Sequence, residues 1–200
     1  MKKLIVTAAL FTGLNTLLAQ PTTWQIDPVH SSITFSVDYM VLTEVSGKFK
    51  EFSGTLERDG NDLTKGRFNV EIKTASISTD NEKRDGHLRS ADFFDAEKFP
   101  QVSFVTKSID KLDGNNYTVK GDLTMHGVTK PFVIAAVYAG EAKDPWGKTR
   151  EGFKGTASVK RSEFGVKYNS ALESGGVLIS DDVKITLNMQ FVKQQPAGSN

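Results

Sequence analysis

The 200-residue chain contains no cysteine. That absence excludes disulfide bonds as a source of stability, acylation at a lipoprotein cysteine, and thiolate ligands for a metal ion. A hydrophobic core must therefore hold the fold on its own, and a chain of this length can bury a core of sufficient size.

An excess of charge of one sign is missing too. The sequence has 25 Lys and Arg against 24 Asp and Glu, and it contains no run of five basic residues. Binding to nucleic acid or to an acidic membrane surface relies on a strongly basic chain or patch. We therefore expect no nucleic-acid partner.

Long apolar runs are confined to the N-terminus, where two lysines precede an apolar stretch from Leu4 to Leu18. The stretch is shorter than the roughly 20 apolar residues of a spanning helix, and polar residues interrupt it. It predicts a secretory signal peptide over residues 1–19 rather than an uncleaved anchor. We expect one exported domain over residues 20–193, a flexible tail over residues 194–200, and no stable membrane insertion.

Motifs of catalysis and nucleotide binding are also absent. The chain has no Gly-x-Ser-x-Gly elbow, no phosphate-binding loop and no Gly-x-Gly-x-x-Gly. Its histidines, His30, His87 and His126, do not have the spacing of metal ligands, and we expect them to make hydrogen bonds at turns and strand ends. The sequence thus predicts no catalytic residue, no metal site and no cofactor.

What the chain does have is alternation of apolar and polar residues, the signature of a strand with one buried face. Turn signals such as Asp59-Gly60-Asn61-Asp62, Asp113-Gly114-Asn115-Asn116, His126-Gly127 and Asp144-Pro145-Trp146-Gly147 separate the alternating segments. The segments are Ile33–Tyr39, Lys48–Arg58, Phe68–Ile72, Val102–Phe104, Tyr117–Met125, Phe132–Tyr138, Phe153–Val159 and Val183–Phe191.

About eight antiparallel strands with one apolar face each must close into a barrel or pack as a sandwich, and periodicity does not choose between the two. The segment Ser78–Pro100 breaks the alternation. Thr79 and Glu82 have the spacing of a capping box there, which predicts one or two helical turns. We expect these turns to pack over an end or a flank of the β structure.

The predicted inward positions mix large residues such as Phe35 and Phe104 with small ones such as Gly121 and Gly155. The interior of an eight-stranded barrel is either filled by side chains or hollow enough for one small ligand. Small inward residues favour a hollow interior, but complementary packing of large and small side chains explains them as well. Both interpretations stay open on the residues alone.

Several blocks of the sequence resemble the YceI-like family of periplasmic, lipocalin-like polyisoprenoid-binding proteins. They occur in family order across the whole predicted domain, and together they are specific. The blocks are Trp24–Ile33, Gly47–Phe49, Arg84–Asp95, Phe99-Pro100, Gly121–Pro131, Gly152-Phe153 and Arg161–Gly165.

The resemblance implies an all-β fold, an eight-stranded antiparallel lipocalin-like barrel with a short helical segment near its opening. It also implies a periplasmic protein that carries or sequesters a long-chain apolar lipid of the polyisoprenoid, isoprenoid quinone or fatty-acyl type, and it is compatible with a homodimer. The residues expected to line the lipid cavity are Phe35, Val37, Phe68, Val70, Phe104, Leu123, Met125, Phe132, Ile134 and Leu187.

At the cavity mouth, Arg84, His87 and Arg89 are candidates to meet a polar or phosphorylated head group, since arginine matches phosphate by bidentate hydrogen bonding. Alternatively, Arg84 and Asp85 lock the helical segment to the barrel. Three other functions remain open: an outer-membrane barrel, a lipid-modifying enzyme of an uncharacterised kind, and a chaperone-like module that holds lipids without delivering them.

Overall fold

A computed structural model describes residues 21–171 and 177–195 of the chain. The predicted signal peptide and the last five residues of the predicted tail lie outside the described residues. The strands are β1 (Thr22–Ile26), β2 (Ser32–Tyr39), β3 (Thr43–Phe49), β4 (Phe52–Arg58), β5 (Arg67–Lys73), β6 (Ile77–Ser78), β7 (Gln101–Lys111), β8 (Asn116–Met125), β9 (Val128–Lys143), β10 (Thr149–Lys160) and β11 (Ile179–Lys193).

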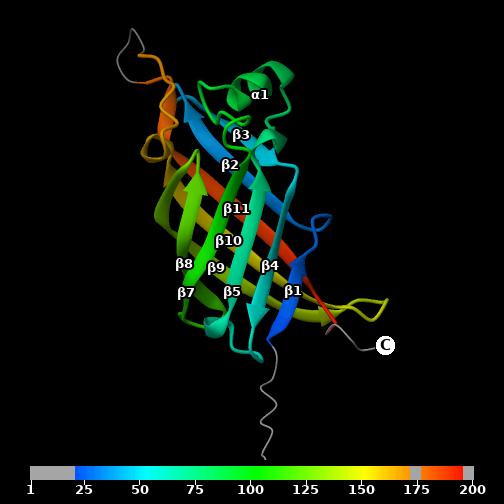
Figure 1. Cartoon of the computed structure of the whole chain (residues 1–200). Helices are drawn as coiled ribbons and strands as arrows, with labels where there is room; N and C mark the ends of the chain where they lie inside the picture. The colour runs from blue at the N-terminus through cyan, green and yellow to red at the C-terminus, as the bar shows by residue number, and fades with distance from the viewer. Residues whose placement is uncertain (1–20, 172–176, 196–200) are drawn as a thin grey trace, which may run out of the picture.

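These strands form a closed, eight-stranded antiparallel barrel, as predicted (Figure 1). Three of the eight strand positions around the barrel are each occupied by two short strands. β1 and β2 lie one after the other along β11, β3 and β4 share the next position, and β5 and β6 share the third. Each position pairs with the next in chain order, and β11 closes the barrel by pairing with β1 and β2.

Alternation placed most of the strands correctly. It missed residues 43–47 of β3, the two residues of β6 and the part of β7 beyond Phe104. The predicted strand Lys48–Arg58 is interrupted at Lys50 and Glu51, where the chain passes from β3 to β4. β1 was not predicted, because its five residues, Thr-Thr-Trp-Gln-Ile, are too few and too polar to show a clear period. Trp24 and Ile26 nevertheless give β1 a buried face.

The faces of the strands follow the alternation. Along β11, Lys184 and Thr186 are exposed, whereas Ile185 and Leu187 line the interior. An outer-membrane barrel has the opposite pattern, with an apolar outer band.

At the turn between β8 and β9, His126 and Gly127 have positive φ angles, 50° and 75° respectively, as a two-residue hairpin turn with left-handed residues requires.

A short helix, α1 (Glu82–Arg89), lies over one end of the barrel, which confirms the predicted helical segment near the opening (Figure 1). The predicted capping box is wrong. Asn81 caps α1 by accepting a hydrogen bond from the backbone N–H of Arg84 at 3.0 Å. Thr79 bonds instead to Asp85, through both its backbone N–H at 2.8 Å and its hydroxyl.

The opposite end of the barrel is filled. Trp24, Leu56, Leu63 and Phe191 are buried together there, close to a 3₁₀ turn, Leu63–Lys65. Buried clusters of this kind supply the stability that a chain without disulfides needs. The barrel is therefore plugged at the end opposite α1.

Candidate binding cavity

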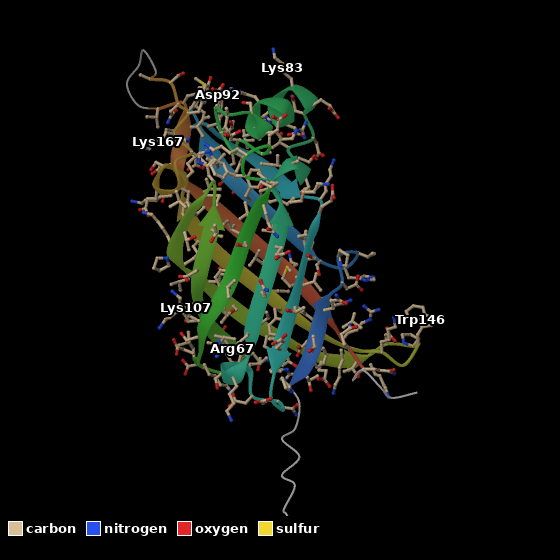
Figure 2. All side chains as sticks on the ribbon, viewed as in Figure 1. Arg67, Lys83, Asp92, Lys107, Trp146 and Lys167 are labelled. Atoms are coloured by element: carbon tan, nitrogen blue, oxygen red, sulfur yellow. The ribbon has the colours of Figure 1, made fainter. Side chains whose placement is uncertain are left out.

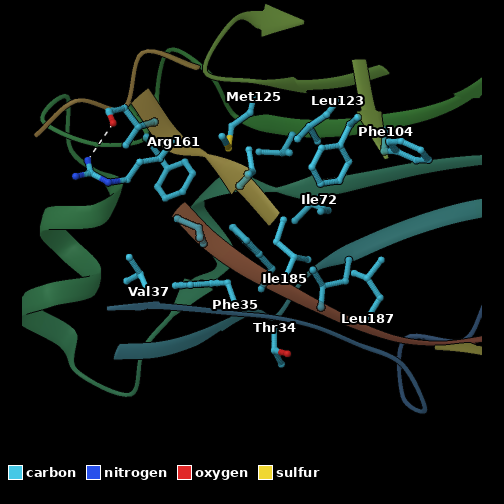
Figure 3. A pocket seen from close by; sticks show the side chains of 18 of the residues that line it. Thr34, Phe35, Val37, Ile72, Phe104, Leu123, Met125, Arg161, Ile185 and Leu187 are labelled. Atoms are coloured by element: carbon cyan, nitrogen blue, oxygen red, sulfur yellow. Dashed lines mark hydrogen bonds between the residues drawn. The ribbon is translucent and has the colours of Figure 1, made fainter. Parts of the chain in front are cut away.

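The part of the barrel next to α1 encloses a cavity of about 740 Å³ with a predominantly apolar lining (Figure 3). This volume lies within the roughly 300–1,000 Å³ of typical ligand sites. All ten residues predicted for the cavity line it: Phe35, Val37, Phe68, Val70, Phe104, Leu123, Met125, Phe132, Ile134 and Leu187. Whether they contact a ligand stays a prediction.

Two of the inward glycines, Gly47 and Gly121, serve packing, whereas Gly155 lines the cavity. A Cβ atom added to Gly121 would lie 2.6 Å from Cζ of Phe104, and one added to Gly47 would collide with the ring of Phe35. Each glycine therefore lets an aromatic ring on a neighbouring strand lie flat against the barrel wall. Complementary packing explains these glycines, and the cavity exists beside them.

Three aromatic rings form the floor of the cavity. Phe68, Phe153 and Phe191 lie with ring centroids 5.3–5.7 Å apart. All three line the cavity, and they also pack against the filled end of the barrel. The floor thus sets the depth to which an apolar chain can enter.

A buried ion pair lies in this filled end. The Arg58 guanidinium donates to the Glu151 carboxylate at 2.8 Å, and the two residues are 4% and 1% exposed. Burial raises the pKa of Glu151 to about 7, although the charge of Arg58 opposes the shift. Extending the alternation of Phe153–Val159 back by two residues places Glu151 inward, so the sequence contained a signal that was missed.

At the other end, α1 borders the cavity. The guanidinium of Arg84 donates to the Thr79 hydroxyl at 2.7 Å and to the Thr79 carbonyl at 3.0 Å. His87 bonds to Asp92 at 2.9 Å, and its ring packs against Tyr168. Arg84 and His87 both line the cavity.

Arg89, the third residue predicted for the mouth, is not among the residues that line the cavity. Its charge acts elsewhere, because together with Arg84 it lowers the pKa of Asp85. Burial by itself would raise that pKa, but the hydrogen bonds from Thr79 and these two charges outweigh it. Arg84 and Asp85 therefore bond α1 to Thr79, directly after β6. That they lock the whole helical segment to the barrel stays a prediction.

A further arginine at the cavity wall, Arg161, was not predicted for the site. Its guanidinium donates to the backbone carbonyls of four residues that follow in the chain: Val166, Tyr168, Ile179 and Ser180. Burial lowers the pKa of Arg161, and the charge of Asp181 acts in the opposite direction. These bonds hold the chain after β10 against the start of β11, which shapes one side of the mouth.

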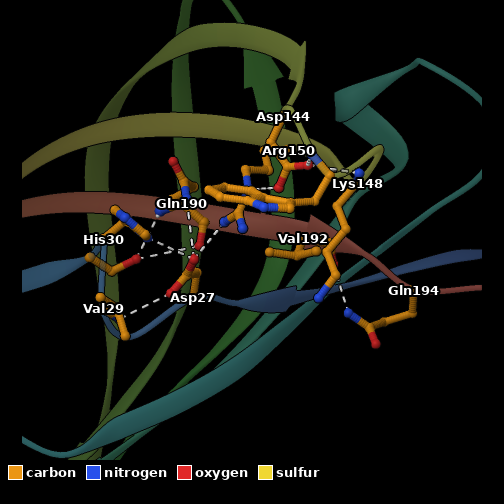
Figure 4. Close-up of polar contacts among 11 residues, drawn as sticks. Asp27, Val29, His30, Asp144, Lys148, Arg150, Gln190, Val192 and Gln194 are labelled. Atoms are coloured by element: carbon orange, nitrogen blue, oxygen red, sulfur yellow. Dashed lines mark hydrogen bonds and ion pairs between the residues drawn. The ribbon is translucent and has the colours of Figure 1, made fainter.

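His30 lies away from the cavity, at the junction of β1 and β2 (Figure 4). It bonds to Asp27 at 2.9 Å, and Arg150 bridges Asp27 and Asp144. Burial tends to raise the pKa of Asp27, but the hydrogen bonds from His30 and Arg150 hold it well below its usual range. The structure thus gives His30 a bonding role at a turn, as predicted.

The described residues contain no group of three His, Asp or Glu side chains placed to hold a metal ion. Within the same residues, no helix has both the length and the apolarity needed to cross a membrane. No Asp or Glu of the described part lines the cavity, whereas Arg84, His87, Lys154 and Arg161 do.

Fold and site together define an antiparallel β-barrel with one closed end and an apolar internal cavity. The chain belongs to the YceI-like domain family, whose model matches residues 24–191. A UPF0312 protein of Pseudomonas savastanoi is 41% identical over 69% of this chain and 72% of its own length. One from Vibrio vulnificus is 40% identical over 80% of this chain and 88% of its own length.

Solved structures agree with this assignment. The YCEI protein of Campylobacter jejuni has a TM-score of 0.69 at 31% identity, covering 79% of this chain and 90% of its own. BcnA of Burkholderia cenocepacia has a TM-score of 0.72 at 25% identity, covering 82% and 98%. A polyisoprenoid binding domain from Saccharophagus degradans shares the fold, with a TM-score of 0.63 at 14% identity over 86% and 98%.

Proposed function

We propose that this protein holds a long-chain apolar lipid in its barrel, as a carrier or sequestering protein, and catalyses no reaction. The observation that carries the proposal is the apolar cavity of about 740 Å³, closed at one end by the aromatic floor. The name of the Saccharophagus degradans domain adds a ligand class, polyisoprenoids. Isoprenoid quinones and fatty-acyl lipids have tails of the same chemistry.

In such a site the apolar tail of a lipid contributes more binding free energy than its polar head group. Each buried CH₂ group contributes about 0.8 kcal/mol, so a long tail offsets the cost of association without polar contacts. Selectivity then depends on tail length and on the mouth. We propose Arg84 and His87 as head-group contacts, because they line the cavity end next to α1 and no acidic residue of the described part faces them in the lining.

Location is part of the same proposal. The lysines and the apolar stretch at the N-terminus favour export, and the resemblance to the YceI-like family favours the periplasm as the destination. A barrel that shields an isoprenoid or acyl chain from water suits an aqueous compartment between membranes. Export is tested by comparing the N-terminus of protein from the exported fraction with the full sequence.

A pair of neighbouring alanines on β9 tests the cavity. Ala136 lines the cavity, whereas Ala135 is exposed on the outer face of the same strand. We expect Ala136→Phe to lower affinity for a polyprenyl lipid by about tenfold or more, since the larger ring takes space from the tail. Ala135→Phe, the matched control, leaves affinity unchanged.

Equal affinity in both variants would refute the cavity as the binding site. Catalysis has its own test, which is prolonged incubation of the protein with the bound lipid, followed by extraction and mass analysis. We expect the lipid to be recovered intact. Steady conversion that stops in His87→Ala would instead establish an enzyme.

A further inference from the structure

Exposed apolar residues form the connection between β2 and β3, residues Tyr39–Leu42, here termed the β2–β3 tip. Val41 and Leu42 are 84% and 79% exposed, and Tyr39 and Met40 are 37% and 38% exposed. The tip contains no charged residue. Neighbouring large apolar side chains left in water mark an interaction site.

The backbone of the tip is strained at two residues that disfavour positive φ angles. Met40 and Val41 have φ angles of 54° and 59°, and the N–H of Leu42 donates to the Tyr39 carbonyl at 3.1 Å. Two-residue turns of this kind favour Asn-Gly, and a β-branched residue such as Val41 is an outlier in the left-handed region. Strained, exposed apolar residues lower stability, so they point to a role in function.

The tip is joined directly to the cavity. Tyr39 and Thr43, on either side of the turn, both line the cavity. The N–H of Met40 donates to the carbonyl of Leu178 at 2.9 Å, and Leu178 lines the cavity too. An apolar chain leaving the interior past Tyr39 and Leu178 therefore reaches the tip.

We propose that the β2–β3 tip inserts into the apolar layer of a lipid bilayer, so that ligand passes between the membrane and the cavity beside it. This inference rests on the proposed function, because it assumes that the cavity takes a lipid tail. Transfer through water would expose the whole tail, which the hydrophobic effect opposes. A mouth that touches the bilayer removes that barrier.

The size and composition of the tip favour a bilayer over a protein partner. A stable protein interface buries roughly 800 Å² per partner, more than a four-residue turn supplies. A few inserted apolar side chains give weak, reversible attachment to a bilayer, like that of a single lipid anchor. Reversible attachment suits a protein that must leave the membrane with its ligand.

The chain offers a matched control for the test. Val29, in the turn between β1 and β2, is 82% exposed and does not line the cavity. Trp146 is also 82% exposed and projects from the β9–β10 loop, away from α1 (Figure 2). Val41→Ser with Leu42→Ser is therefore compared with Val29→Ser with Trp146→Ser, which removes equally exposed apolar residues elsewhere.

The experiment measures transfer of a fluorescent polyprenyl lipid between phosphatidylcholine vesicles, and co-flotation of the protein with those vesicles. The tip variant is expected to lose co-flotation and to transfer lipid about tenfold more slowly. Its affinity for the same lipid delivered from cyclodextrin stays at the wild-type value. The control variant matches the wild type in all three measurements.

A transfer rate of the tip variant within about twofold of the wild type would overturn membrane docking. The same conclusion would follow if the substitutions dissolved a homodimer, seen by analytical ultracentrifugation, and left co-flotation intact. Uptake from cyclodextrin reports on the proposed function separately. If the wild type took up no lipid by that route, the cavity function itself would fail and the docking proposal with it.

Discussion

The Arg58 guanidinium and the Glu151 carboxylate meet at 2.8 Å in the filled end of the barrel, in surroundings that exclude water from both residues. A buried ion pair gives no assured gain in stability, since desolvation opposes the attraction of the charges. In Glu151 desolvation prevails, because the pKa is raised from 4.5 to about 7. The pair therefore makes stability depend on pH.

The folded state holds the proton of Glu151 more tightly than the unfolded chain does. Its contribution to stability is present in full below about pH 4.5 and is lost as the pH rises toward 7. We expect the free energy of unfolding of the wild type to fall by an amount on the order of 2 kcal/mol across this window. Glu151→Gln lacks that decline. Urea unfolding at intervals of pH checks this, and equal slopes would contradict it.

The lowered pKa of Asp27 predicts the opposite dependence of stability on pH. Its pKa lies below the usual value because His30 and Arg150 hydrogen-bond to the carboxylate despite its burial. Its contribution is therefore present above about pH 3.8 and is lost as the pH falls through the lower, folded-state value. Asp27→Asn should cost about 1–2 kcal/mol at neutral pH and less in acid. A constant cost at every pH would argue against the ion-pair network as its source.

Substitutions of two glycines distinguish a glycine required by side-chain packing from one that only adds backbone flexibility. Gly121→Ala places a Cβ against Phe104, so we expect a loss of about 1–3 kcal/mol in the free energy of unfolding. Gly86→Ala, in α1, meets no atom within 4 Å and should stabilise the protein by about 0.5–1 kcal/mol. Thermal unfolding of the two variants measures both effects. A neutral Gly121→Ala would mean that the Phe104 ring and the Val105 carbonyl oxygen, both of which the added Cβ would collide with, can move aside.

Substitution of Arg84 distinguishes a structural role, in which it holds α1 to Thr79, from recognition of a lipid head group. Arg84→Ala removes two hydrogen bonds to Thr79, and about 1 kcal/mol of stability should be lost. If Arg84 also meets the head group, affinity for a polyprenyl phosphate falls while affinity for the matching alcohol does not. Titration with both lipids measures this difference. Equal losses for the two lipids would restrict Arg84 to a structural role.

Alternation was sufficient to predict most of the strands, because a sheet with an apolar inner and a polar outer face imposes a period of two. The choice of a barrel over a sandwich came from the family resemblance and not from the period. That period placed Leu187 and Phe132 on the inner face without further information. The interruption at Lys50 and Glu51 escaped prediction, since exposed polar residues are compatible with a strand or with a break. Inward glycines were ambiguous for a similar reason, because a small residue is compatible with an empty space or with a ring packed over it.

The polar residues of the interior were the hardest to predict. Arg161 bonds to carbonyls that come together only when the chain after β10 meets β11, which no local pattern reveals. Arg58 occupies an inward position of an alternating segment, and Glu151 occupies the inward position two residues before another, yet the two lie far apart in the sequence. Two opposite charges at inward positions of different strands are the signal that would have indicated the pair.

The central claim is that the cavity holds a long apolar lipid, and native mass spectrometry tests it most directly. The protein is purified from its exported fraction without detergent, weighed intact, and extracted with organic solvent to identify what is released. We predict one isoprenoid or acyl lipid per barrel, displaced when the cavity is narrowed by Ala136→Phe. An empty barrel that also takes up no added quinone, polyprenyl phosphate or fatty acid would contradict the claim.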